Sequence, residues 1–176
     1  MATAAIQEVS EGMIDIRWFL AAMVVFMLIQ NKAEASPCST QDQITTLAMA
    51  LYHEGRGEGT VGMLAIGEVI IQRVNSHRWP DDICGVVYQP SNNPENHVKC
   101  QFSYTCDDSL KLAALDKAKY KEAERLAFDL YWGIIDLSVT NRSDHYLRCD
   151  VVVDNSWTEA LEFTLRINNH CFYKYK

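Results

Sequence analysis

A glutamate at the end of an apolar helical stripe is the residue best suited to acid–base chemistry. Leu47, Leu51 and Glu54 are spaced by four and three residues, so a helix places all three on one face. Burial on that face raises the pKa of a carboxyl, and the negative end of the helix dipole acts in the same direction. Such a carboxyl can donate a proton near neutral pH, as a general acid must. The alternatives are a solvated Glu54 at a frayed helix end and an ion pair with Arg56.

Glycines surround the residues that follow this glutamate, and they let the backbone approach a ligand closely. Residues 51–75 read LYHEGRGEGTVGMLAIGEVIIQRVN. Glu58 lies four residues after Glu54, but the glycines mean that this spacing does not establish a shared helical face. We expect Glu58 to be either a carboxylate of a binding groove or a cap for the next helix.

Further motifs follow in an order that is known from one family. After EGRGE and GMLAIG come WPDDICGVVYQP, QFS at 101–103, DHY at 144–146 and HCFY at 170–173. From about Leu47 to Tyr173, this ordered series resembles the SleB-type cell wall hydrolases, a family with a lysozyme-like catalytic domain. Each motif is weak alone, and their order makes the resemblance specific.

The chain departs from the family pattern at several positions, and none of them is the first glutamate. Gly55 stands where the family has alanine, Gln72 where it has asparagine, and Asp144 where it has threonine. Residues 91–100 resemble an insertion before the QFS motif. This insertion bears on the shape of the binding groove, whereas the implied activity is unaffected.

The resemblance implies cleavage of the peptidoglycan glycan strand between N-acetylmuramic acid and N-acetylglucosamine. The family's catalytic acid corresponds here to Glu54. In a lytic transglycosylase this one carboxyl protonates the glycosidic oxygen and then takes a proton from the sugar's own 6-hydroxyl, which leaves a 1,6-anhydro product. A hydrolysing muramidase uses a second carboxylate, and no spacing recommends any of the candidates, Glu58, Asp107, Asp108 and Asp144. We therefore predict the single-acid mechanism without a cofactor.

Four residues are candidates for substrate binding beside this acid: Glu58, Gln101, Phe102 and Tyr146. The Gln101 side chain both donates and accepts hydrogen bonds, which suits the acetamido and hydroxyl groups of sugars. Phe102 is predicted either to stack on a sugar ring or to belong to the core. The resemblance indicates Tyr146 as a groove residue.

Two other classes of function are alternatives: an amidase or endopeptidase of the peptide stem, and a wall-binding lysis accessory without catalysis. Most stem-cutting enzymes need zinc or a Cys–His pair. The His53-Glu54 pair lacks the second histidine of His-Glu-x-x-His. For His145 and His170 we expect hydrogen-bonded structural roles rather than metal binding. We predict no metal site, and activity that survives a chelator would separate the glycan-cleaving function from a zinc enzyme.

The elements that must position these residues are mostly helices, and we predict an α+β, predominantly helical, lysozyme-like domain with a small β element. Apolar periodicity and capping residues predict long helices from Thr40, capped with Gln43, to Glu54, from a Thr60 cap to residue 78, and over 108–135. A shorter element capped by Asp81-Asp82 is predicted to end at Val87, before a loop over 89–107. Short strands are predicted at 145–147 and 151–153, and a last helix or turn over 157–167.

The N-terminus predicts export. Residues 18–29 form an unbroken apolar run of 12 residues, shorter than the about 20 of a membrane span and typical of a signal peptide core. Ala33-Glu34-Ala35 matches the small-x-small cleavage pattern. Residues 1–35 are therefore predicted to be a signal peptide and residues 36–176 an exported catalytic domain, periplasmic or secreted. An uncleaved signal-anchor is the alternative, and Met13 is an alternative start.

The cysteines agree with export. All six follow residue 35, and an even number behind an export signal implies disulfides. The sequence does not choose the pairing, but we expect at least one partnership within Cys84, Cys100 and Cys106, because short loops close easily.

Composition and charge favour a globular domain that does not bind nucleic acid. Hydrophobic residues make up 48% of the 176 residues, and 16 Lys+Arg against 23 Asp+Glu give a net charge of −7. An acidic chain without a basic run is a poor candidate for nucleic-acid binding.

We expect peptidoglycan as the partner, membrane contact only through the N-terminal signal, and a monomer. The sequence fits both a bacterium that remodels its own wall and a phage that lyses its host.

Overall fold

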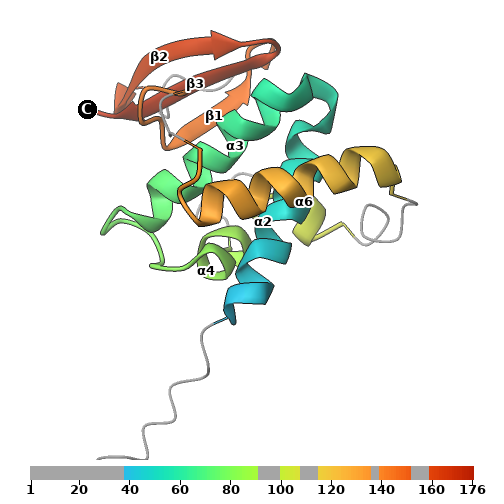
Figure 1. Ribbon diagram of the computed structural model, residues 1–176. Coiled ribbons are helices and arrows are strands. Elements are labelled where there is room, and N and C mark those ends of the chain that lie inside the picture. The colour runs from blue at the N-terminus through green and yellow to red at the C-terminus, as the bar shows by residue number, and fades with distance from the viewer. Residues whose placement is uncertain (1–37, 91–99, 108–114, 136–138, 152–158) are drawn as a thin grey trace, which may run out of the picture. The chain divides into compact units, whose positions relative to one another are not determined.

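The computed structural model describes residues 38–90, 100–107, 115–135, 139–151 and 159–176. The predicted signal peptide lies outside the described residues, as does the predicted insertion except for Cys100. Helices form most of the described chain, and a small antiparallel sheet covers one side of helix α3 (Figure 1). None of the described helices is long and apolar enough to cross a membrane.

Helix α2, Thr40–Gly55, carries the predicted acid in its last turn. The predicted capping box of Thr40 with Gln43 is wrong by one residue: Ser39 is the N-cap, and its hydroxyl accepts the N–H of Asp42 at 3.2 Å. The Gln43 side chain instead accepts the N–H of Ile83 at 3.3 Å. Its amide also donates to the Cys38 carbonyl oxygen at 3.3 Å, so Gln43 links the start of α2 to the start of the next short helix.

The turn after α2 is the 3-10 helix η1, Arg56–Glu58, and helix α3, Gly59–Val74, follows directly. The predicted Thr60 cap is wrong, because Glu58 holds the N-cap position without a side-chain cap bond and the Thr60 hydroxyl donates to Glu122. Gly59 has a φ of 70°, which side chains other than glycine rarely adopt. A Cβ on Gly55 would lie 2.8 Å from the Met63 Cα. The departure from alanine at Gly55 thus lets α2 and α3 approach closely.

Two further helices, α4 and α6, pack with α2 and α3. Helix α4, Ile83–Tyr88, is capped by Asp82, whose carboxylate accepts the N–H of Gly85 at 2.7 Å, which confirms the predicted short element. Helix α6, Lys117–Tyr131, starts later than predicted because Asp116 caps it. Residues 108–114 of that prediction lie outside the described residues. A 3-10 turn, η2, Ser103–Thr105, lies within the predicted loop.

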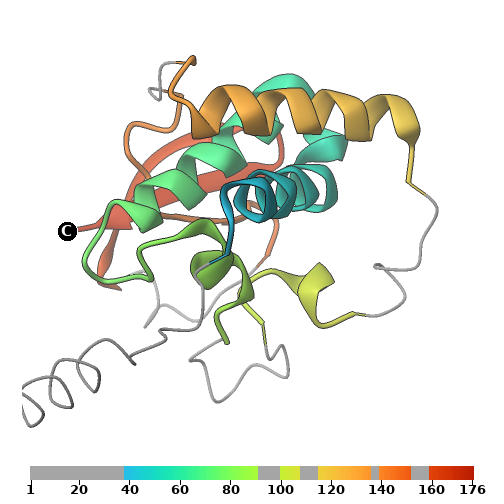
Figure 2. The ribbon, with the colours of Figure 1, turned by 60° about the horizontal axis from the view of Figure 1, so that its bottom comes forward.

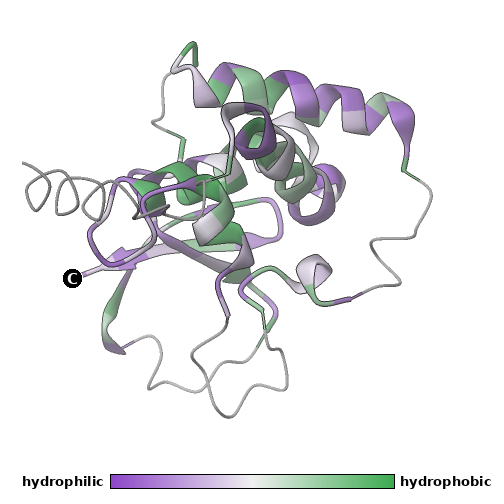
Figure 3. Cartoon of the chain, turned by 90° about the horizontal axis from the view of Figure 1, so that it is seen from below, coloured by the Kyte–Doolittle hydropathy of each residue, from purple (hydrophilic) through white to green (hydrophobic). Residues whose placement is uncertain are grey.

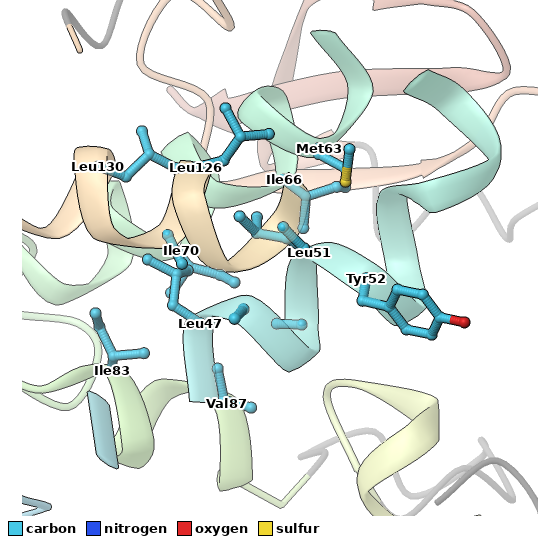
Figure 4. Close-up of a cluster of buried hydrophobic side chains, with 14 of the residues drawn as sticks. Leu47, Leu51, Tyr52, Met63, Ile66, Ile70, Ile83, Val87, Leu126 and Leu130 are labelled. Carbon is cyan, nitrogen blue, oxygen red and sulfur yellow. The ribbon is translucent and has the colours of Figure 1, made fainter. Parts of the chain in front are cut away.

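The core forms where α2, α3, α4 and α6 meet (Figure 2). Apolar side chains from all four helices interdigitate there (Figure 4), among them Leu47, Leu51, Met63, Ile66, Ile70, Ile83, Val87, Leu126 and Leu130. Helix α3 also buries a second face, Ala65 and Val69, against Phe172 of the sheet. Because α3 is apolar on both sides, it is the central element between helices and sheet, and Figure 3 shows green apolar residues along it.

The sheet has the order β1-β3-β2, with β1 His145–Arg148, β2 Leu161–Ile167 and β3 His170–Tyr175 all antiparallel. The strand predicted near 145–147 is confirmed. The helix or turn predicted over 157–167 is wrong for Leu161–Ile167, because this segment pairs with β3 through a tight turn at Asn168-Asn169. Val151 is not in a strand, and Val152 and Val153 lie outside the described residues.

Three disulfides confirm the prediction from the cysteine count: Cys38–Cys84, Cys100–Cys106 and Cys149–Cys171. The first ties the start of α2 to α4. The second closes a short loop and confirms the partnership expected within the Cys84, Cys100 and Cys106 group. The third joins the end of β1 to β3, next to the site described below.

Candidate active site

A pocket of about 550 Å³ opens where the end of α2 faces the sheet. Its helical wall consists of His53, Glu54, Arg56, Gly57 and Glu58 from the end of α2 and from η1. Its strand wall consists of Tyr146, Arg148, Asn169 and His170 from β1, β3 and the turn before β3. The structure thus brings together three of the predicted site residues: Glu54, Glu58 and Tyr146.

Glu54 has the environment that the helical stripe predicts. Burial raises the pKa of its carboxyl, and the hydroxyl of Tyr146, which donates to Oε2 at 3.4 Å, acts weakly in the opposite direction. A single long hydrogen bond compensates little of the cost of removing a carboxylate from water. Glu54 therefore favours its protonated form, the state from which a general acid acts.

Glu58 is the second carboxyl of the helical wall, and the sheet holds it. Asn169 donates its backbone N–H to Oε2 and its side-chain amide to Oε1, both at 3.1 Å. The side chain of Asn168 donates to the Glu58 carbonyl oxygen at 2.8 Å. The backbone hydrogen bond from Asn169 is the main cause that lowers the pKa of Glu58. Glu58 lines the pocket, and its carboxylate fastens the β2–β3 turn to η1.

Tyr146 reaches Glu54 because helix α3 fixes the segment that leads into β1. The buried Arg73 donates from Nε to the carbonyl oxygen of Asp144 at 2.7 Å. The buried Glu68 carboxylate accepts the N–H of Thr140 at 2.7 Å. Both contacts cross from the central helix to the chain before β1, and they set the position of the tyrosine.

An aromatic pair lies behind the acid. The rings of His53 and Tyr104 are stacked with centroids 4.6 Å apart, and Tyr104 is only 3% exposed. Burial lowers the pKa of His53, with the charge of Arg56 adding to the shift, so this histidine is neutral at physiological pH. Burial also raises the pKa of Tyr104, and the charge of Glu54 contributes to that shift. The Glu54 carboxyl therefore has the uncharged His53 and Tyr104 rings as neighbours.

Two predicted substrate-binding residues, Gln101 and Phe102, are not among the residues that line the pocket. Phe102 is 1% exposed and belongs to the core cluster, with the guanidinium of Arg73 5.9 Å from its ring centroid. Of the two alternatives for Phe102, the core is therefore correct and sugar stacking is wrong. The backbone N–H of Gln101 donates to the Gln89 carbonyl oxygen at 3.3 Å, and its substrate-binding role stays a prediction.

The other candidate second carboxylates lie elsewhere. Asp144 is buried and contacts Nδ1 of His145 at 2.7 Å, whereas Asp107 is not a lining residue of the pocket. Asp108 lies outside the described residues. His145 packs between Trp79 and Tyr175, which is the structural role expected for it.

His170 differs from that expectation because it lines the pocket, and burial lowers its pKa. Within the described ranges, no group of three or more His, Cys, Asp or Glu side chains is placed to hold a metal ion. The titratable side chains that line the pocket are two glutamates, two histidines, two arginines and a tyrosine.

Sequence reasoning missed Arg148 and Asn169 on the strand wall. The Asn168-Asn169 dipeptide between two apolar segments is a hairpin signal, and Asn168 has the positive φ of 50° that such turns use. This signal would have placed residues 168–170 at the end of a hairpin. It would not have shown that the hairpin meets η1.

The comparisons with known proteins decide the family. The profile of the Cell Wall Hydrolase family matches residues 57–173. The chain belongs to this family. The match begins three residues after Glu54, so it includes Gly57 and Glu58 of the helical wall and the whole strand wall. It confirms the resemblance that the ordered motifs indicate.

Curated relatives and solved structures agree with the family. The chain is 42% identical over 61 residues to a spore cortex-lytic enzyme of Halalkalibacterium halodurans, covering 34% of this chain and 18% of that protein. It is 34% identical over 80 residues to a spore cortex-lytic enzyme of Oceanobacillus iheyensis, covering 46% of this chain and 26% of that one. The chain thus matches only about a quarter or less of these relatives' length.

The fold is similar to two solved catalytic domains. That of the germination-specific lytic transglycosylase SleB from Bacillus anthracis gives a TM-score of 0.59 at 25% identity, over 80% of this chain and 100% of that one. The catalytic domain of the Bacillus cereus SleB protein gives 0.57 at 26% identity, over 77% and 91%. The predicted α+β, mostly helical fold and the predicted enzyme class, a cell wall hydrolase, are confirmed.

Proposed function

We propose that this chain cleaves the glycan strand of peptidoglycan as a lytic transglycosylase, with Glu54 as acid and then as base. The observation that carries the proposal is the half-buried Glu54 carboxyl in the pocket, whose pKa burial raises. The family and the lytic transglycosylase among the similar structures support the same chemistry. The bond concerned joins N-acetylmuramic acid to N-acetylglucosamine.

The reaction balances with one carboxyl. The Glu54 proton passes to the glycosidic oxygen as the bond from that oxygen to C1 of the muramic residue breaks. The 6-hydroxyl oxygen of the same residue then bonds to C1, and its proton returns to the Glu54 carboxylate. The product carries a 1,6-anhydro ring, and the enzyme ends in its starting protonation state.

The state of Glu58 supports the single-acid mechanism over a hydrolysing muramidase. A second catalytic carboxylate must be free to activate water or to attack the sugar. Both carboxylate oxygens of Glu58 already accept hydrogen bonds from Asn169 at 3.1 Å. We assign Glu58 to holding the pocket walls together, and this contact also shapes the groove.

Tyr146 has a supporting role in this scheme. Its hydroxyl donates to Glu54 Oε2 at 3.4 Å. This bond strengthens when Glu54 becomes a carboxylate, because hydrogen bonds to ionised groups are stronger than neutral ones. Tyr146 therefore orients the acid before proton transfer and stabilises the base after it.

The peptide-stem alternative has less support. A Cys–His nucleophile needs a free thiol, and all six cysteines are paired in disulfides. Those disulfides favour an oxidising compartment outside the cytoplasm. We propose that residues 1–35 direct export and are then removed, and N-terminal sequencing of the exported protein tests this step.

Digestion of purified sacculi followed by mass spectrometry tests the proposed function. The expected products are muropeptides with 1,6-anhydro-muramic ends, released equally in the presence of a chelator. Reducing muramic ends would indicate a hydrolysing muramidase. Intact glycan strands with released stem peptides would contradict glycan cleavage altogether.

A further inference from the structure

Two arginines line the pocket of a chain whose net charge is −7. Arg56 lies on the helical wall, two residues after Glu54, and Arg148 lies on the strand wall. Two glutamates line the same pocket: Glu54, whose pKa burial raises, and Glu58, whose carboxylate accepts hydrogen bonds from Asn169. The pocket thus places two guanidinium groups near the candidate acid in a protein whose net charge is negative.

Arg56 is held in place by a cation–π contact rather than by an ion pair. Its guanidinium lies 4.7 Å from the centroid of the Tyr52 ring. That ring is itself fixed, because Tyr52 is 3% exposed and its hydroxyl accepts the N–H of Asp116 at 2.8 Å. Arg56 forms no ion pair with any other residue in the described ranges. A cation–π contact uses none of the guanidinium N–H groups in a hydrogen bond to a carboxylate, so these groups remain available to a ligand.

Arg148 is oriented by an exposed ion pair with Asp150. Its Nη2 and Nε contact the two carboxylate oxygens of Asp150 at 2.6 and 3.1 Å, and both side chains are 64% exposed. Exposed pairs of this kind contribute little to stability, so a ligand carboxylate can compete with Asp150. The disulfide between Cys149 and Cys171 fixes the backbone next to this arginine.

We infer that Arg56, together with Arg148 across the pocket, forms a subsite for a carboxylate carried by the muramic residue. This inference rests on the proposed glycan-cleaving function. The neutral sugar rings and their acetamido groups carry no charge. The carboxylates of a glycan strand belong to the muramic residue: the lactyl carboxylate when the stem is absent, and the stem-peptide carboxylates when it is attached. Arginine binds carboxylates through paired, charge-assisted hydrogen bonds.

The position of the subsite gives it a function in specificity. Arg56 and Glu54 line the same pocket, so an anionic substituent bound by Arg56 brings its own sugar to the acid. Differential binding of this kind selects which glycosidic bond enters the pocket. The subsite would therefore distinguish muramic residues with charged substituents from those without.

Three preparations of the same glycan strands test this inference with the full exported domain. The first carries stem peptides with free carboxylates, the second carries the same stems with their carboxylates amidated, and the third has its stems removed so that lactyl carboxylates are free. For the wild type we expect a KM roughly 3- to 10-fold higher on amidated strands than on free-acid strands, as for loss of one charge-assisted contact at a partly exposed site.

The variants separate a binding role from a structural one. Arg56→Gln should abolish the preference for free-acid strands, so that its KM is the same on free-acid and on amidated strands. Arg56→Lys should retain part of the preference, since it keeps the charge but not the planar fork. Arg125→Gln is the matched control on the exposed face of α6, where Arg125 pairs with Asp129 at 3.0 Å, and it should behave as the wild type.

Each outcome bears on the subsite. If stem-free strands behave like free-acid strands and lose that advantage in Arg56→Gln, the subsite accepts the lactyl carboxylate as well as a stem carboxylate; if they behave like amidated strands, it accepts a stem carboxylate only. Equal wild-type KM values on free-acid and amidated strands, or an equal loss on all three in Arg56→Gln, would overturn the subsite while anhydro products still supported the proposed function. Absence of anhydro products from every preparation would overturn both.

Discussion

Glu54 and Glu58 lie four residues apart on the helical wall, yet burial raises the pKa of the first while hydrogen bonds lower the pKa of the second. Glu54 ends an apolar stripe and receives one long hydrogen bond, from Tyr146. Glu58 receives two shorter ones, from Asn169. The same side chain is thus suited to donate a proton at one position and to hold a structural contact at the other.

The two walls of the pocket differ in the same way. The helical wall is fixed by the core, since residues 47–52 of α2 are buried there apart from Met49. The strand wall has less apolar packing and is held by the Glu58–Asn169 contact and by the Cys149–Cys171 disulfide. In the proposed function the chemistry depends on the helical wall, and we expect the shape of the pocket to depend on the links to the strand wall.

The largest expected difference between the two glutamates is in the activity lost when each is replaced by glutamine. Glu54→Gln keeps the size of the side chain and should lower turnover of sacculi by about 10²–10⁴, the usual loss for a general acid or base. Release of soluble muropeptides measures it. Glu58→Gln should lose much less activity, and thermal melts should show both variants folded. Equal losses in the two variants would mean that their roles do not differ.

Opening the disulfide of the strand wall should have the next largest effect. Replacing Cys149 and Cys171 together by serine should lower the free energy of unfolding by about 2–4 kcal/mol, as measured by urea denaturation. Replacing Cys100 and Cys106 in the same way is the control. That bridge closes a sequence separation of 6 rather than 22, so its loss should cost less. The opposite ranking would show that the strand wall does not depend on its bridge.

The two carboxyls should also contribute to stability with opposite dependence on pH. A lowered pKa stabilises the fold above the ordinary glutamate pKa, so Glu58→Gln should lower the free energy of unfolding by about 1 kcal/mol at pH 7 and by less as pH falls. A raised pKa destabilises the fold as pH rises, so Glu54→Gln should raise the melting temperature at pH 7 but not at pH 4.

Melting curves between pH 3 and 8, taken as about the range in which glutamates titrate, measure both effects. Glu162→Gln is the control for the loss of an exposed carboxylate, since Glu162 is 3.7 Å from Lys174. It should change the free energy of unfolding by less than about 0.5 kcal/mol. Parallel pH profiles for Glu54→Gln and Glu58→Gln would contradict the contrast between the two sites.

The smallest effect should come from Tyr146→Phe. The hydroxyl of Tyr146 favours the ionised form of Glu54, so its removal should raise the pKa of Glu54 further. The alkaline limb of the pH–rate profile should then move to higher pH, with the structure unchanged. A shift to lower pH would mean that Tyr146 does not donate to the carboxylate.

The helical wall could be predicted from local sequence. Spacing places Leu47, Leu51 and Glu54 on one face of the helix, and the structure selects the desolvated Glu54 from the alternatives that this spacing left open. The caps of α2 and α3 were predicted less well, because Thr40 and Thr60 are as capable of capping as the residues actually used.

The strand wall could not be predicted in this way. Leu161–Ile167 is a strand because β3 pairs with it, a contact that helical periodicity does not reveal. The contact of Asn169 with Glu58 joins residues 111 positions apart. Phe102 could equally have stacked on a sugar or filled the core, and only its tertiary surroundings distinguish the two.

The central claim is that Glu54 is protonated when Glu58 is ionised, and a direct titration tests it. Carbon-13 NMR of glutamate carboxyls, assigned with Glu54→Gln and Glu58→Gln, follows each group separately as pH changes. We expect Glu54 to titrate above the ordinary glutamate pKa and Glu58 below it. A Glu54 carboxyl that ionises at or below the ordinary value, or one that ionises before Glu58, would contradict the account.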